Sequence, residues 1–253
     1  MGKNPDEARL LAERVLKADR GNTTAAIILC RALMLMNRAE EAIVPLERAV
    51  RRSNDPSAEV MLASALAAAG RSEDAIRQVQ QATQRHPTFP PAHLEYAKVL
   101  DQGGQRAEAI KVLERALALM PDVIDLQMVL ARLLFDNNER ARARELLSQA
   151  SARASGRQDI LAELARIVHV DGDYAAAAEI YRRALALQAD AADIRANYGA
   201  CLLEMGRRDA GEAAIREAAR GRPQMFGRAV ASMIVASHGR FFLRPSKAAK
   251  FLR

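Results

Sequence analysis

The chain has 253 residues, a formal net charge of +7 and only 4% aromatic residues, and it is long enough for one elongated domain. No apolar segment follows Met1-Gly2-Lys3, and no run of about 18 apolar residues occurs, so the sequence predicts neither a secretory signal nor a membrane span. Together these features favour a cytoplasmic location.

The positive charge is concentrated near one end of the chain. The whole sequence has 38 basic and 31 acidic residues, but residues 206–253 alone contain 11 Lys or Arg and three Asp or Glu. Residues 1–205 are therefore close to neutral. If charge selects an anionic partner, the last fifth of the chain is where that partner is expected to bind.

Small residues recur at a nearly constant interval along most of the sequence. One column, with a period of about 34 residues, consists of Ala49, Ala82, Ala116, Ala150, Ala184 and Ala218. A second column lies seven residues earlier and consists of Ala42, Ala75, Ala109, Ala143, Ala177 and Gly211. A fixed period in this range indicates supersecondary units stacked one on the next.

A third column, five residues before the second, contains only Gly or Asn. Its members are Asn37, Gly70, Gly104, Asn138, Gly172 and Gly206. These two residue types tolerate the positive φ with which many helices end, so the column predicts a turn in every repeat. Apolar residues recur at helical spacing on both sides of the turn, as at Leu130, Leu133 and Leu134. Each repeat is therefore expected to be a helical hairpin.

This pattern resembles the tetratricopeptide repeat, a helix-turn-helix unit with small residues at its eighth, twentieth and twenty-seventh positions. Counted from Pro90, the third repeat matches at Tyr96, Ala97, Leu100, Gly104, Ala109, Leu113, Ala116 and Pro121. The resemblance covers six full repeats, at 23–55, 56–89, 90–123, 124–157, 158–191 and 192–225. It implies an all-α fold, a right-handed α-α superhelix.

The two ends are expected to cover the apolar faces of the repeat array. Residues 1–22 contain a lone second helix, because Ala8 lies one repeat period before Ala42. Residues 226–253 are predicted to form an extra first helix followed by a basic, aromatic tail. Terminal helices of atypical sequence are typical of repeat proteins.

The repeats depart from the family pattern at position four, which is often aromatic in the family. Here that position is occupied by Ala26, Glu59, His93, Gln127, Leu161 and Arg195. We expect His93 to be a packing residue.

The sequence offers no catalytic constellation. None of the four histidines has a Cys, Asp or Glu at a recognised metal-ligand spacing, and no glycine-rich phosphate loop follows a strand. Cys30 and Cys201 are about five repeats apart, so they are expected to be small buried residues and not a disulfide. We therefore expect a non-enzymatic protein without metal or cofactor.

The resemblance implies that first helices line a concave groove, where positions nine and twelve commonly contact the ligand. The candidate groove residues are Arg31, Lys98, Arg132, Phe135, Arg166 and His169. Their cations would suit the carboxylates of an extended acidic segment, since Arg can hold a carboxylate by two parallel hydrogen bonds. The alternative is that they are ordinary solvated groups, because Glu95 and Glu163 each precede a cation by three residues and Arg132 precedes Asp136 by four.

The tail admits two interpretations as well. Its candidate residues are Phe241, Phe242, Arg244, Lys247, Lys250 and Phe251. They could fold back as a lid over the last repeat, which we favour, or dock on an acidic protein, a membrane surface or nucleic acid. Nucleic acid is disfavoured, because no interleaved aromatic pattern extends into the groove.

The function that these features favour is a protein-protein interaction scaffold that holds a peptide or partner protein in its concave groove. Two alternatives stay open. The chain could be the adaptor module of a larger transferase or hydroxylase, which would require a reading frame that continues beyond Arg253. It could instead bind anionic surfaces through its basic tail, with a steep dependence on salt. No oligomeric state is predicted.

Overall fold

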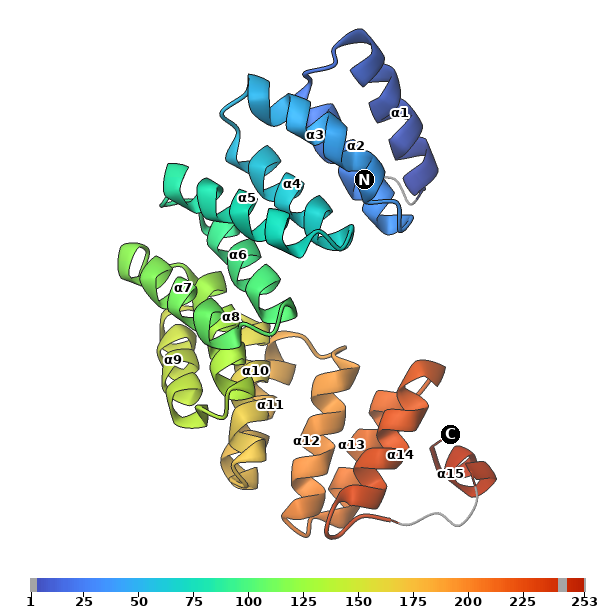
Figure 1. The fold of residues 1–253 in the computed structure, drawn as a ribbon. Helices are drawn as coiled ribbons and strands as arrows, with labels where there is room; N and C mark the ends of the chain where they lie inside the picture. The colour runs from blue at the N-terminus through green and yellow to red at the C-terminus, as the bar shows by residue number, and fades with distance from the viewer. Residues whose placement is uncertain (1–3, 241–244, 253) are drawn as a thin grey trace. The chain divides into compact units, whose positions relative to one another are not determined.

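The computed structural model describes residues 4–240 and 245–252, and every regular element in these ranges is helical (Figure 1). The first helices of the six repeats are α2 (Thr23–Leu35), α4 (Pro56–Ala68), α6 (Pro90–Gln102), α8 (Ile124–Asp136), α10 (Gln158–Val170) and α12 (Ala192–Glu204). The second helices are α3 (Glu40–Arg52), α5 (Ser72–Arg85), α7 (Arg106–Leu119), α9 (Arg140–Arg153), α11 (Tyr174–Leu187) and α13 (Arg208–Ala219).

Four further elements are neither first nor second helices of these repeats. They are α1 (Pro5–Ala18), a 3₁₀ turn η1 (Pro223–Met225), α14 (Phe226–Val235) and α15 (Pro245–Leu252). The helices divide into two compact units, residues 1–133 and 134–253, with the boundary near the end of α8.

The Gly/Asn column marks the turns within the repeats, as predicted. All six residues have positive φ, from 56° at Asn37 to 84° at Gly172. In each turn, the N–H of the next residue donates to a carbonyl five residues earlier, as from Arg38 to Leu33 at 2.8 Å and from Gln105 to Leu100 at 2.8 Å. This bond satisfies a carbonyl that the helix end leaves without an intrahelical partner.

The alanine columns form the contacts between helices in both units. Every alanine of the two columns is at most 1% exposed. A methyl group is small enough to let two helix backbones approach closely while still filling the space between them. The helices of a hairpin and those of neighbouring repeats therefore meet at the same places in every repeat.

In the residue 134–253 unit, glycines replace alanine where α12 meets α13. A methyl group at Gly199 would lie 2.7 Å from Ile215 Cγ1 and 2.9 Å from the Gly211 carbonyl oxygen. Beyond this hairpin, α14 packs on α12 and α13, and α15 packs on α13 and α14. The last repeat is therefore covered by α14 and α15.

Ala150 offers a test of the register. It is fully buried in α9, so Ala150→Leu should overpack a helix contact and lower the free energy of unfolding by about 1–3 kcal/mol. Thermal melts followed by circular dichroism measure the loss. Ala141→Leu, at an exposed alanine of the same helix, is the matched control and should leave the midpoint unchanged. Equal midpoints for Ala150→Leu and wild type would contradict the assigned register.

Candidate functional site

Position nine of the first helices carries three cations in the residue 1–133 unit. Arg31, Lys98 and Arg132 are all exposed. The Lys98 ammonium donates to both carboxylate oxygens of Glu95 at 3.1 Å. Arg31 and Arg132 have no ion pair among the described residues. Arg31 and Arg132 are therefore exposed to solvent without an ionic partner among the described residues. Lys98 instead pairs with Glu95, as expected if it is an ordinary solvated residue.

In the residue 134–253 unit, the candidate residues Phe135 and Arg166 are brought together by neighbouring first helices. The Arg166 Nε donates to Glu163 at 2.9 Å, and its guanidinium carbon lies 4.1 Å from the centre of the Phe135 ring. Arg166 therefore takes part in an ion pair with Glu163 and in a cation–π contact with Phe135. Phe135 is half-buried beneath it, so its ring is partly occupied by this contact.

His169 is half-buried beside a first-helix cysteine of the next repeat. Its Nδ1 lies 3.4 Å from the Cys201 sulfur, and its ring meets Tyr174 edge-on with the centroids 5.5 Å apart. Burial lowers the pKa of His169 below its ordinary value, against the opposing effect of Glu204. The imidazole is therefore neutral at pH 7 and can offer apolar surface to a ligand but no charge.

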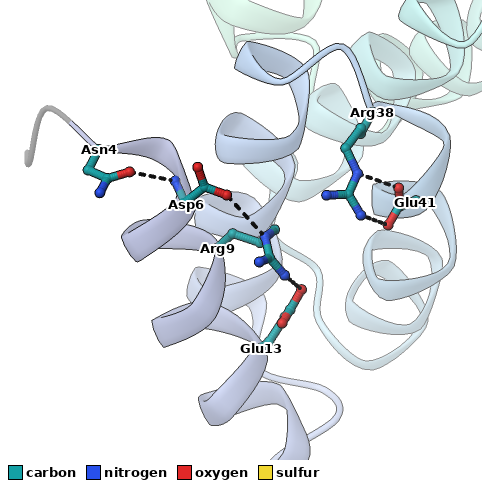
Figure 2. A network of polar contacts seen from close by, with 6 residues as sticks. All are labelled: Asn4, Asp6, Arg9, Glu13, Arg38 and Glu41. Atoms are coloured by element: carbon teal, nitrogen blue, oxygen red, sulfur yellow. Dashed lines mark hydrogen bonds and ion pairs between the residues drawn. The ribbon is translucent and has the colours of Figure 1, made fainter.

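A groove of about 720 Å³ lies between α1 and α2, and sequence reasoning did not identify it. Of the described residues that line it, only Arg31 is charged; the others include Leu11, Val15, Ile28 and Leu35. Figure 2 shows charged residues of α1, where Arg9 contacts Asp6 at 4.0 Å and Glu13 at 2.7 Å. None of these three residues lines the groove.

The described part of the tail packs on the last repeat. In α15, Ala248 and Leu252 are buried, and the Phe251 ring is approached by the guanidinium carbons of Arg240 at 4.5 Å and Arg216 at 5.0 Å. Arg240 in turn donates to both carboxylate oxygens of Glu212, at 3.0 and 3.2 Å. Lys247 and Lys250 are exposed. Phe241, Phe242 and Arg244 lie outside the described residues.

Neither cysteine is suited to chemistry. Cys30 and Cys201 are fully buried free thiols. Burial raises the pKa of Cys30 to about 11 and that of Cys201 to about 12. Both stay protonated at neutral pH, and the thiol is a far weaker nucleophile than the thiolate.

The described residues hold no group of three or more His, Cys, Asp or Glu placed to share a metal ion. Among the described helices, none combines the length and apolar character that crossing a bilayer requires.

The chain consists of helical hairpins that stack through columns of small residues, which is the architecture of an all-α repeat protein. The all-α fold predicted from the sequence is therefore confirmed. A tetratricopeptide repeat model matches residues 2–66, 66–133, 102–167 and 171–233. The chain belongs to the tetratricopeptide repeat family, as its sequence pattern indicated. In general terms it is a scaffold for protein interactions.

Solved structures with the same fold come from distant organisms. The thermophilic protein TTC0263 of Thermus thermophilus is 23% identical, with a TM-score of 0.56 over 72% of this chain and 99% of its own. PilF of Pseudomonas aeruginosa is 18% identical, with a TM-score of 0.63 over 90% and 99%. The human IFIT1 dimer with m7Gppp-AAAA is 17% identical, with a TM-score of 0.64 over 92% and 60%. At these identities the likeness concerns the fold alone. No curated protein sequence matches the chain.

The two thiols give a prediction about chemical labelling. In the native protein at pH 8, a thiol reagent such as DTNB should modify Cys30 and Cys201 only slowly, because both are buried and protonated. In guanidinium chloride both should react at once. Absorbance of the released thiolate measures the two rates. Rapid labelling of either cysteine in the native protein would contradict this account.

Proposed function

We propose that this protein is a non-enzymatic scaffold whose first helices hold an extended acidic segment of a partner protein. The observation that carries the proposal is the exposure of Arg31 and Arg132, with no ion pair among the described residues. An exposed guanidinium without an acidic neighbour can bind a ligand carboxylate without first breaking an ion pair within the protein. A cytoplasmic location remains a prediction of the sequence.

The paired cations support the same function less directly. Lys98 and Arg166 have acidic neighbours three residues earlier in their own helices. The side chains of Lys98 and Glu95 are 49% and 11% exposed, and those of Arg166 and Glu163 are 35% and 37% exposed. Solvent that reaches the two cations screens these pairs, so a ligand carboxylate can compete for each cation. Beside Arg166, the rings of Phe135 and His169 offer partly exposed apolar surface. Each unit therefore contributes positions of its own to ligand binding.

Charge reversal tests this proposal in each unit separately. The double variant Lys98→Glu with Arg132→Glu should weaken binding of a fluorescent acidic dodecapeptide about tenfold, because two attractions become repulsions. Arg166→Glu tests the other unit in the same way. Fluorescence anisotropy measures the affinities, and circular dichroism verifies that helicity is unchanged.

The chain offers closely matched controls for both variants. Lys111 pairs with Glu108 at i,i+3 on a second helix, as Lys98 does with Glu95 on a first helix. Arg182 pairs with Glu179 as Arg166 does with Glu163. Lys111→Glu and Arg182→Glu should change affinity much less. If first-helix and second-helix reversals weaken binding equally, the groove proposal is wrong and the peptide is responding to overall charge.

We also propose that the tail is a lid over the last repeat. Ala248, Phe251 and Leu252 turn toward α13 and α14, while Lys247 and Lys250 face solvent. Burial of apolar area stabilises by about 25 cal/mol per Å², and this contribution opposes the entropy that is lost when the helix is ordered.

Deletion of residues 240–253 separates the lid from a docking segment. Loss of a lid should lower the melting temperature by several degrees and promote self-association, because it exposes the apolar residues beneath α15. Calorimetry and sedimentation velocity measure the two effects. A docking segment would leave both unchanged and would remove only salt-sensitive binding to anionic vesicles, an outcome that would refute the lid. Lys250→Gln, at an exposed position of α15, is the control for charge alone.

A further inference from the structure

Three arginines line one cleft in the residue 134–253 unit. The cleft has a volume of about 490 Å³ and is lined by side chains of α12 and α13, which pack on each other. Its lining residues in the described part of the chain are Arg195, Ala213, Ala214, Arg216, Glu217 and Arg220. All but Arg195 lie on α13, where their spacing places them on one face of the helix. The cleft is large enough for a small ligand.

Arg216 has no ion pair among the described residues because the acid one turn before it is engaged elsewhere. Glu212 precedes Arg216 by four residues, a spacing at which ion pairs form. Its carboxylate instead accepts hydrogen bonds from Arg208 at 3.0 Å and from Arg240 at 3.0 and 3.2 Å. The guanidinium carbon of Arg216 lies 5.0 Å from the centre of the Phe251 ring. This contact gives its N–H donors no acceptor.

Arg195 is held in place while most of its donors stay available. Its Nη2 donates to the Ala189 carbonyl oxygen at 2.5 Å, which ties the side chain to the loop before α12. The guanidinium has several further N–H donors. The acids nearest to it in the sequence, Asp190 and Asp193, pair with later arginines. Within the described residues, the charge of Arg195 therefore has no ionic partner.

The third arginine has a partner, but an exposed one. Arg220 contacts Glu217 at 2.9 Å, and the two side chains are 70% and 45% exposed. Solvent screens a pair of this kind, so Arg220 can also contact another anion. With three positive groups and one negative group, the described lining of the cleft has a net charge of +2. Residues 206–253, with 11 Lys or Arg and three Asp or Glu, add a field of the same sign.

We propose that this cleft binds a phosphate monoester. At neutral pH such a group has about two negative charges and several strong acceptor oxygens, which match the net charge and the available N–H donors of the cleft. Arginine can hold a phosphate by two parallel hydrogen bonds, and Arg195 and Arg216 approach the cleft from different helices. A single carboxylate would neutralise only part of this charge.

The site is separate from the residues proposed to hold an acidic segment. None of Arg31, Lys98, Arg132 and Arg166 lines the cleft. Because the chain is a scaffold for protein interactions, a phosphorylated serine of a partner protein is one source of the ester, and a free phosphorylated small molecule is the other. Both present the same chemistry to the arginines.

A phosphopeptide provides the probe. A BODIPY-labelled peptide of glycine and alanine with one central phosphoserine and an amidated end has no other charged side chain. Anisotropy titrations of the full chain should show saturable binding. The same peptide with glutamate in place of phosphoserine should bind about tenfold more weakly, because it has one charge and fewer acceptor oxygens.

Loss of one cleft charge should weaken binding of the phosphopeptide about tenfold. Arg195→Gln keeps the tie to the loop, because Gln127 at the same position of another repeat donates to the equivalent carbonyl at 2.8 Å. Arg216→Gln removes the other unpaired charge. Arg207→Gln is the matched control: it removes the same charge from an exposed arginine of the same unit that does not line the cleft, and it should change affinity less than about twofold.

Competition with free O-phosphoserine identifies the source of the ester. If it displaces the probe as well as the unlabelled phosphopeptide does, the cleft binds the phosphate group alone. If it displaces the probe much less well, the chain around the phosphoserine contributes, and either result supports the site. Three outcomes would overturn the proposal: no saturable binding, equal affinity for the phosphoserine and glutamate peptides, or an equal loss of affinity with Arg207→Gln and Arg216→Gln. Failure of the acidic-segment proposal would change none of these measurements.

Discussion

Close approach between helices at the alanine columns is the constraint on which the rest of this structure depends. Ala49, Ala82 and Ala116 are fully buried where a larger side chain would have no space. The glycine pair at α12 and α13 shows the limit, since even a methyl group at Gly199 would come within 2.9 Å of the Gly211 carbonyl oxygen. The repeat period in the sequence is thus a packing interval. Wherever the repeat period continues in the sequence, the next helical hairpin stacks on the previous one in the same way.

Much of the fold could be predicted because this constraint acts locally and repeatedly. Positive φ at Asn37 and Asn138 follows from residue type and position alone, and the turns then fix where the helices begin and end. The ends were harder to interpret. The offset of Ala8 from Ala42 predicted a helix before the first full repeat, where the structure has α1, but it did not predict that Val15 and Leu11 are about half exposed beside a groove.

Position four shows what the sequence pattern could not reveal. Three of its polar side chains bond to the carbonyl six residues earlier: His93 with Pro87 at 2.9 Å, Gln127 with Pro121 at 2.8 Å and Arg195 with Ala189 at 2.5 Å. They replace the missing aromatic by tying each first helix to the loop before it. Buried Glu59 bonds instead to Arg85 at 2.6 Å. Residue types alone do not predict these bonds, because they depend on the path of the loop.

The candidate site was predictable to a similar extent. The pairs of Lys98 with Glu95 and of Arg166 with Glu163 follow from helical spacing. Contacts between repeats, such as Arg166 on Phe135 and His169 on Cys201, join residues that are nearly one repeat period apart. The period predicts that such residues belong to neighbouring helices, but side-chain direction decides whether they touch.

The apolar surface is covered to a different extent at α15 and at α1. At the last repeat, the guanidinium groups of Arg216 and Arg240 both approach the Phe251 ring, and Arg240 is held by the buried carboxylate of Glu212. Burial alone would raise the pKa of Glu212, but hydrogen bonds from Arg240 and Arg208 hold it below its usual value. The carboxylate therefore stays charged at neutral pH and keeps Arg240 in place. At α1 no equivalent helix covers the surface within the described residues, and the groove contains a single cation. The two ends therefore differ in chemistry: the groove beside α1 is apolar apart from Arg31, whereas α15 directs Lys247 and Lys250 to solvent.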